Sequence, residues 1–171
     1  MRFNVSNIIM FISFVILQIV IAGLIDFGPL LFISIYPLFL LTLPVNISTN
    51  KLMLWAFFIG LTIDYFSNSI LGINSAASII MVTCQPWVLK IIYRKGDLEN
   101  QIRPGMRQLG IARFTAYIMI CLAIHHLTLS LLEGFSLINF IYNLPRVFIS
   151  LIVNTLLIQI IEFGVFYKRS R

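Results

Sequence analysis

The sequence predicts an all-α integral membrane protein with six transmembrane helices and both termini in the cytoplasm. Of its 171 residues, 60% are hydrophobic and only 11% are charged, whereas soluble domains carry roughly 25% charged residues. Long apolar runs alternate with short polar turns, and an apolar helix needs about 20 residues to cross a bilayer. We therefore expect residues 1–171 to form one transmembrane domain, without a separate soluble domain.

The first two spans are expected at residues 7–25 and 29–45. The first follows Arg2, is longer than the apolar core of a typical signal peptide and lacks a small-x-small cleavage site, so we expect it to remain uncleaved. The second is short, and Pro37 interrupts it while Pro44 closes it. Because proline removes a backbone donor and clashes with the preceding turn, this span is predicted to be kinked or broken.

The next two spans are expected at residues 51–67 and 73–93, the latter with a kink at Pro86. Residues 94–110 then form the one long polar segment of the sequence. We expect a solvated cytoplasmic linker whose charges set the topology. The alternative is a surface that binds a cytoplasmic partner or anionic lipid headgroups.

The last two spans are expected at residues 111–132 and 144–167. Asn143 is the predicted cap of the final helix, and Pro145 is predicted to open it, because a proline in the first turn gives up a donor that has no helical partner.

The basic residues predict the orientation. With a cytoplasmic N-terminus, all Lys and Arg residues except Arg146 fall on or near the inner side, as the positive-inside rule requires. This distribution explains the net charge of +6 without a nucleic-acid partner. The expected location is a cell membrane, crossed several times.

Catalysis and metal binding are not expected. Cys84 and Cys121 lie singly in apolar runs, which is typical of buried thiols rather than of a disulfide or a zinc site. His125 and His126 are neighbours and point about 100° apart on a helix, so they are poorly placed to share a metal. The sequence also lacks a phosphate-binding loop, a GxSxG motif and paired carboxylates. We expect a protein without enzyme activity or cofactor.

The third span carries the most informative motif. Gly60, Asp64 and Asn68 are four residues apart and share one stripe of the helix. A small residue such as Gly60 allows close helix packing in membranes. Asp64 is a lone carboxylate in an apolar run, where a charge costs about 3 kcal/mol on insertion scales, so it indicates a functional site. Asp64 either contacts a neighbouring helix or partner, or caps the polar turn that follows.

The turn after Asn68 predicts a packed hairpin between the third and fourth spans. Gly72 is expected to take a positive φ, and Asn74 or Ser75 to cap the fourth helix. The small residues 76–78 then form a face that can pack closely on the third span.

Several other polar residues are candidates for contacts between spans. Arg146 is the single basic residue predicted on the outer side, where it pairs with Glu133, pairs with Asp64 or lies among the lipid headgroups. Three amides inside apolar runs are expected to cross-link helices through hydrogen bonds: Gln18, Asn154 and Gln159.

The order of these features resembles the bacterial rod shape-determining protein MreD family. That family shows a Gly-Leu-x-x-Asp segment followed by Leu-Gly-x-Asn-x-Ala in the third and fourth spans. The matching residues here are Gly60, Leu61, Asp64, Leu71, Gly72, Asn74 and Ala76. Elsewhere the similarity is one of hydropathy and loop lengths.

The resemblance implies a non-enzymatic scaffold of the cell-wall elongation machinery in the bacterial inner membrane. Its partners would be MreC, RodA with its penicillin-binding transpeptidase, membrane lipid and, indirectly, MreB filaments. Residues expected to pack helices or bind partners are Gly60, Asp64, Asn68, Gly72, Asn74 and Arg146.

The MreD family is also similar in fold to the substrate-binding S components of energy-coupling-factor vitamin transporters, which supply the alternative function. Such components typically carry an Ala-x-x-x-Ala patch on the first span. The first span here has Ala22 as its only alanine, which favours the scaffold.

Overall fold

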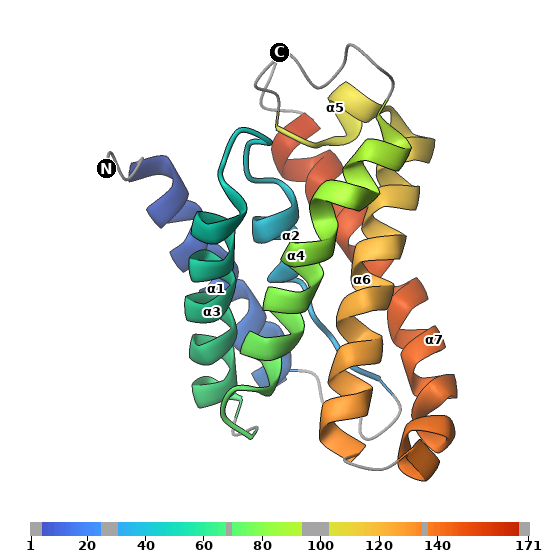
Figure 1. The fold of residues 1–171 in the computed structure, drawn as a ribbon. Coiled ribbons are helices and arrows are strands. Elements are labelled where there is room, and N and C mark those ends of the chain that lie inside the picture. The colour runs from blue at the N-terminus through green and yellow to red at the C-terminus, as the bar shows by residue number, and fades with distance from the viewer. Residues whose placement is uncertain (1–4, 25–30, 68–69, 94–102, 135–136, 168–171) are drawn as a thin grey trace.

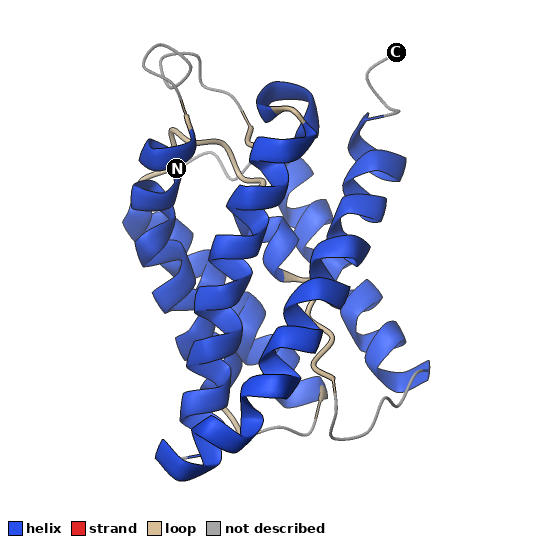
Figure 2. Ribbon diagram, turned by 90° about the vertical axis from the view of Figure 1, so that its right-hand side faces the viewer, coloured by secondary structure: helices blue, strands red, loops and turns tan. Residues whose placement is uncertain are grey.

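The computed structural model describes residues 5–24, 31–67, 70–93, 103–134 and 137–167. Within these ranges every regular element is a helix (Figure 2), which confirms the predicted all-α class. In chain order the elements are α1 (Val5–Leu24), α2 (Pro37–Leu41), α3 (Thr49–Phe66), α4 (Ile73–Ile92), α5 (Met106–Leu109), α6 (Ile111–Gly134), α7 (Leu137–Ile161) and the π-helix η2 (Glu162–Tyr167).

Four helical segments are long and apolar enough to cross a membrane: Val5–Leu24, Ile73–Ile92, Ile111–Gly134 and Ile138–Val165. They correspond to the first, fourth, fifth and sixth predicted spans, and they indicate a membrane protein. α3 occupies the third predicted span and lies beside α1 and α4 (Figure 1). It is not among the four segments, because Asn50, Lys51 and Asp64 make its sequence more polar.

The second predicted span is not a continuous helix. Residues 31–35 have no regular structure, and only Pro37–Leu41 is helical. Pro37 lies in the first turn of α2, where its missing N–H costs nothing. Figure 1 shows the segment before α2 as a thin light-blue line between the helices, which returns the chain along the bundle from α1 towards the start of α3. The predicted break at Pro37 is confirmed.

The last predicted helix begins earlier than expected. α7 starts at Leu137, so Asn143 and Pro145 lie inside it and neither marks its beginning. Residues 137–142 continue the apolar helical pattern, and proline within an apolar helix removes only one backbone hydrogen bond. Neighbouring helices commonly compensate for that loss in membrane proteins. Pro86 is likewise inside α4.

The core of the bundle surrounds α2. All five residues of α2 are buried, and they pack against apolar side chains of the surrounding helices. Phe39 anchors this core, with its ring centroid 5.8 Å from that of Phe11 in α1 and 5.4 Å from that of Trp55 in α3. The short helix therefore fills the centre of the bundle, as a packed layer of side chains does in a soluble core.

Basic residues gather at one end of the bundle, which we call the basic end. It includes the start of α3, the end of α4, α5 and the start of α6, and α1 begins there as well (Figure 1). The described basic residues at this end are Lys51, Lys90, Arg103, Arg107 and Arg113.

The part of the polar loop that the structure describes, residues 103–110, is not a solvated linker. Met106 and Leu109 of α5 are buried against the bundle. Burial lowers the pKa of Arg103, and the nearby Glu162 carboxylate opposes this shift. α5 therefore packs against α6 and η2 at the basic end, instead of only connecting α4 to α6.

Candidate functional site

The α3–α4 hairpin closes around Gly60. A Cβ atom at this position would lie 2.4 Å from Ser75 Cα and 2.5 Å from Ser75 N, closer than real side chains approach a backbone. Ser75 Oγ also donates a hydrogen bond of 3.1 Å to Phe57 O. The predicted close packing at Gly60 is therefore present, and only glycine fits there without moving α4.

Asp64 caps α4 from the last turns of α3. Its side chain is fully buried, and its two oxygens accept hydrogen bonds from the backbone N–H groups of Gly72 (2.9 Å), Asn74 (3.1 Å) and Ser75 (3.4 Å). The first N–H groups of a helix have no partner within it, and the positive end of the helix dipole attracts a carboxylate. Of the two interpretations that the sequence left open, this geometry favours the cap.

The turn between the two helices partly follows the prediction. Gly72 has a φ of +96°, as expected for the glycine of this turn. The expected cap by Asn74 or Ser75 is wrong: the residue at the N-cap position is Gly72, and no cap side chain bonds there. The carboxylate of Asp64 takes that role from the neighbouring helix. Asn68 lies outside the described residues.

From Asp64 a chain of hydrogen bonds leads into the centre of the bundle. Asn74 Nδ2 donates to Asp64 Oδ1 (2.8 Å), and the Tyr36 hydroxyl donates to Asn74 Oδ1 (3.0 Å). The Tyr36 hydroxyl also lies 2.7 Å from His125 Nε2, and Ser78 Oγ donates to it over 3.3 Å. α4 and α6 thus meet the segment before α2 at Tyr36, and Asn74 connects this point to Asp64 of α3.

The direction of these bonds fixes the tautomer of His125. A carboxylate only accepts hydrogen bonds, so Asn74 must direct its NH₂ group to Asp64 and its carbonyl to Tyr36. Tyr36 has one proton, which it gives to Asn74. His125 must then donate from Nε2, and its Nδ1 carries no proton.

Side chains of α1 and α7 hold residues 31–36, the segment before α2, which we call the inner segment. Gln18 of α1 donates to Ile33 O (2.7 Å) and accepts from the backbone N–H of Ile35 (2.7 Å). Asn154 of α7 accepts from the N–H of Ser34 (2.9 Å) and donates to Phe32 O. Buried backbone groups without a helix need such partners in an apolar environment.

The same α7 side chain connects the inner segment to the second histidine. Asn154 Nδ2 lies 3.2 Å from His126 Nε2, and the His126 ring stacks on Phe32 at 6.3 Å between centroids. The rings of His125 and His126 are 5.5 Å apart. The histidines therefore join the Asp64 chain to the inner segment, although each keeps a buried Nδ1 without a hydrogen-bond partner in the described ranges.

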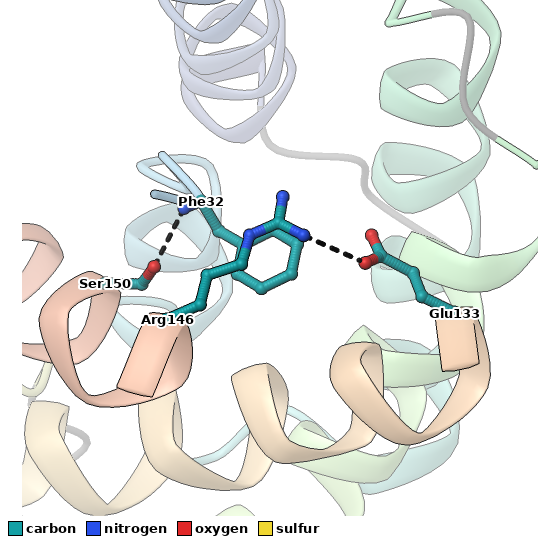
Figure 3. A network of polar contacts seen from close by, with 4 residues as sticks. All are labelled: Phe32, Glu133, Arg146 and Ser150. Carbon is teal, nitrogen blue, oxygen red and sulfur yellow. Dashed lines mark hydrogen bonds and ion pairs between the residues drawn. The ribbon is translucent and has the colours of Figure 1, made fainter. Parts of the chain in front are cut away.

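Arg146 of α7 contacts the inner segment at Phe32 (Figure 3). Its guanidinium is 3.5 Å from Glu133 Oε2 and 3.4 Å above the centroid of the Phe32 ring. The backbone N–H of Phe32 donates to Ser150 Oγ over 2.8 Å. Of the partners that the sequence offered for Arg146, the structure has Glu133, with an added cation–π contact.

The predicted cross-links between helices are present for two of the three amides: Asn154 of α7 contacts His126 of α6, and the half-buried Gln159 Nε2 of α7 donates to Thr115 Oγ1 of α6 over 2.6 Å. Gln18 binds the inner segment instead of another helix. Tyr36 and the joint role of the two histidines were not predicted from the sequence. A pair of adjacent histidines inside an apolar run is itself a signal for a polar contact in a membrane protein.

The network is suited to holding helices together. In the described part of the chain, no group of three or more His, Cys, Asp or Glu side chains could hold a metal ion. No protein-family model, curated protein or solved structure matches the chain. Its fold defines the class: an all-helical membrane protein whose helices are joined by a buried polar network.

Proposed function

We propose that this chain is a non-enzymatic membrane scaffold of the bacterial cell-wall elongation machinery, of the MreD type. The observation that carries the proposal is the α3–α4 hairpin. Gly60 admits the backbone of α4, Asp64 caps that helix, Gly72 makes the turn and Asn74 extends the polar chain. Four of the seven residues of the sequence resemblance therefore act together as one structural unit, which supports relationship more than isolated matches do.

In this role the protein presents apolar helices to other transmembrane proteins. The face of α1 that points away from the bundle exposes Ile9, Ile12, Ile16 and Val20. In a membrane such a face meets lipid or another helix. The proposed partners are MreC, RodA with its transpeptidase and, through them, MreB. The proposed topology keeps six crossings of a bacterial cell membrane, with both termini and the basic end in the cytoplasm.

The first experiment is co-purification of the protein with its partners. The chain carries a tag at its C-terminus, native membranes are solubilised gently, and the recovered proteins are identified by mass spectrometry. Recovery of MreC and the elongation synthases is the expected result. Recovery of ATPase subunits with a transmembrane coupling protein would instead assign the chain to transport.

A matched pair of variants connects the hairpin to this function. Gly60→Leu should separate α3 from α4 and should reduce partner recovery and rod shape. Gly164→Leu in η2 is the control, because a Cβ at Gly164 meets nothing within 4 Å and this residue lies outside the exposed face of α1. Normal partner recovery and normal rod shape with Gly60→Leu would refute the role of the hairpin.

One observation favours the alternative, an S component of an energy-coupling-factor vitamin transporter. The inner segment is extended at the centre of the bundle, and transporters often bind substrate where a membrane helix is interrupted. Here backbone N–H groups of that segment donate hydrogen bonds to Gln18, Ser150 and Asn154, so side chains of the protein itself occupy them. Whether ATPase subunits co-purify with the chain distinguishes the transporter from the scaffold.

A further inference from the structure

The backbone of the inner segment depends on side chains of other elements. α7 binds three of its polar groups: the N–H of Phe32 donates to Ser150 Oγ (2.8 Å), the N–H of Ser34 donates to Asn154 Oδ1 (2.9 Å), and Asn154 Nδ2 donates to Phe32 O. From the other side, Gln18 of α1 binds two further backbone groups. The non-helical form of the segment therefore needs both helices in place.

The α7 side chains are made long after the residues that they bind. Ser150 and Asn154 follow Phe32 and Ser34 by 118 and 120 positions. In the apolar interior of a membrane, a helix can pair its own backbone groups without other elements. A buried N–H or C=O without a partner costs more than one hydrogen bond gains. Until α7 packs on the bundle, a helix is therefore the structure that pairs the backbone of the inner segment.

The sequence of the inner segment is compatible with a helix. Residues 29–45 form an apolar run, from which the sequence predicts a membrane span. Pro37 would lie inside such a helix and would remove one of its hydrogen bonds. This chain already holds Pro86 inside α4 and Pro145 inside α7, so a proline does not prevent a helix in this bundle. A helix through residues 31–41, continuous with α2, is therefore available to the chain.

We propose that the inner segment is a conformational switch that α7 controls. With Ser150 and Asn154 in place, residues 31–35 are held out of the helical form. When α7 moves away from them, these residues wind into a helix that is continuous with α2. Two packings of one sequence can differ by little free energy. The switch would operate whether the chain is a scaffold or a transporter component, because it depends only on these hydrogen bonds.

The test compares two α7 variants of the full-length protein in lipid bilayers by solid-state NMR of carbon-13-labelled samples. The Cα shifts of residues 31–35 distinguish helical from non-helical backbone. Leucine in Asn154→Leu has a similar volume but binds neither Phe32 nor Ser34, so we expect helical shifts throughout residues 31–35. Gln159→Leu is the matched control, because this α7 amide binds Thr115 of α6 and not the inner segment. It should keep the wild-type shifts.

Ser150→Ala is the milder second variant, which decides the test if Asn154→Leu does not accumulate. It removes the acceptor of the Phe32 N–H and leaves both Asn154 bonds. We expect two sets of signals for residues 31–35, one helical and one as in the wild type, because the two forms become similarly populated. Wild-type shifts alone in Ser150→Ala, and in any Asn154→Leu protein that is recovered, would overturn the switch. Helical shifts in Gln159→Leu would overturn it too, since that variant leaves the controlling bonds intact.

Discussion

At the scale of single residues, Asp64 is the most informative side chain because its surroundings explain how a charge is tolerated there. A lone carboxylate at membrane depth costs about 3 kcal/mol on insertion scales. Here its oxygens accept three backbone hydrogen bonds and one from Asn74 Nδ2. The same bonds remove three unpaired N–H groups from the start of α4. The buried carboxylate of Asp64 and the unpaired N–H groups at the start of α4 would each be unfavourable alone, and they stabilise each other.

The capping role predicts a specific cost for Asp64→Asn. Asparagine keeps the shape but has one acceptor oxygen, and its NH₂ group would face other donors. We expect a loss of about 3 kcal/mol in the free energy of unfolding, because one or two buried N–H groups become unpaired. The measurement is thermal unfolding in detergent, with Ser67→Ala as an exposed control at the end of α3. Equal stability of Asp64→Asn and the wild type would contradict the cap.

The tautomer of His125 is a second prediction at this scale. The chain from Asp64 through Asn74 and Tyr36 requires a proton on His125 Nε2 and none on Nδ1. The chain has only two histidines, so nitrogen NMR of protein with labelled histidine can assign both. Tyr36→Phe should change the His125 signals strongly and those of His126 little. A proton on His125 Nδ1 in the wild type would show that the direction of the chain is reversed.

At the scale of elements, the structure pairs one tight helical hairpin with one helix that is broken. The hairpin forms from local sequence signals, since Gly60, Asp64 and Gly72 lie within 13 residues of each other. The inner segment depends on distant residues instead. Ser34 bonds to Asn154, 120 positions away, and Ile35 bonds to Gln18 of another helix. These side chains replace the backbone bonds that a continuous helix would have made.

The close approach at Gly60 predicts that larger side chains there destabilise the hairpin. Gly60→Leu places side-chain atoms where the backbone of Ser75 lies, and overpacking of this kind costs about 3 kcal/mol. We expect a lower unfolding temperature and less protein in the membrane. Gly23→Leu, with open space around the added side chain, should behave as the wild type. Comparable unfolding temperatures for both variants would mean that α4 can move away at little cost.

At the scale of the whole molecule, composition and hydropathy predicted the all-α class, and four of the six predicted spans correspond to helices long and apolar enough to cross a membrane. They could not predict the extended course of residues 31–35, because an apolar run with a proline has the same composition whether it is helical or extended. They also placed the start of α7 too late, because the apolar helical pattern of residues 137–142 continues through Pro145. Long-range partners decided the course of residues 31–35, where Gln18 and Asn154 bind the backbone.

The distribution of charge over the bundle predicts its orientation. Lys51, Lys90 and the described basic residues of 103–113 lie at one end, whereas Arg146 pairs with Glu133 at the end of α6 that is furthest from them. Since Lys and Arg are retained on the cytoplasmic side of a membrane, the basic end should face the cytoplasm.

Single cysteines can test this orientation, in a variant whose two native cysteines are replaced by alanine. Ser67→Cys lies at the exposed end of α3, and Gln108→Cys lies on the exposed face of α5 at the basic end. A membrane-impermeant maleimide applied to intact spheroplasts should label Ser67→Cys at once and Gln108→Cys only after permeabilisation. The reverse pattern would invert the proposed topology. Because α5 packs on the bundle through Met106 and Leu109, that result would also place the basic end on the outer side of the membrane.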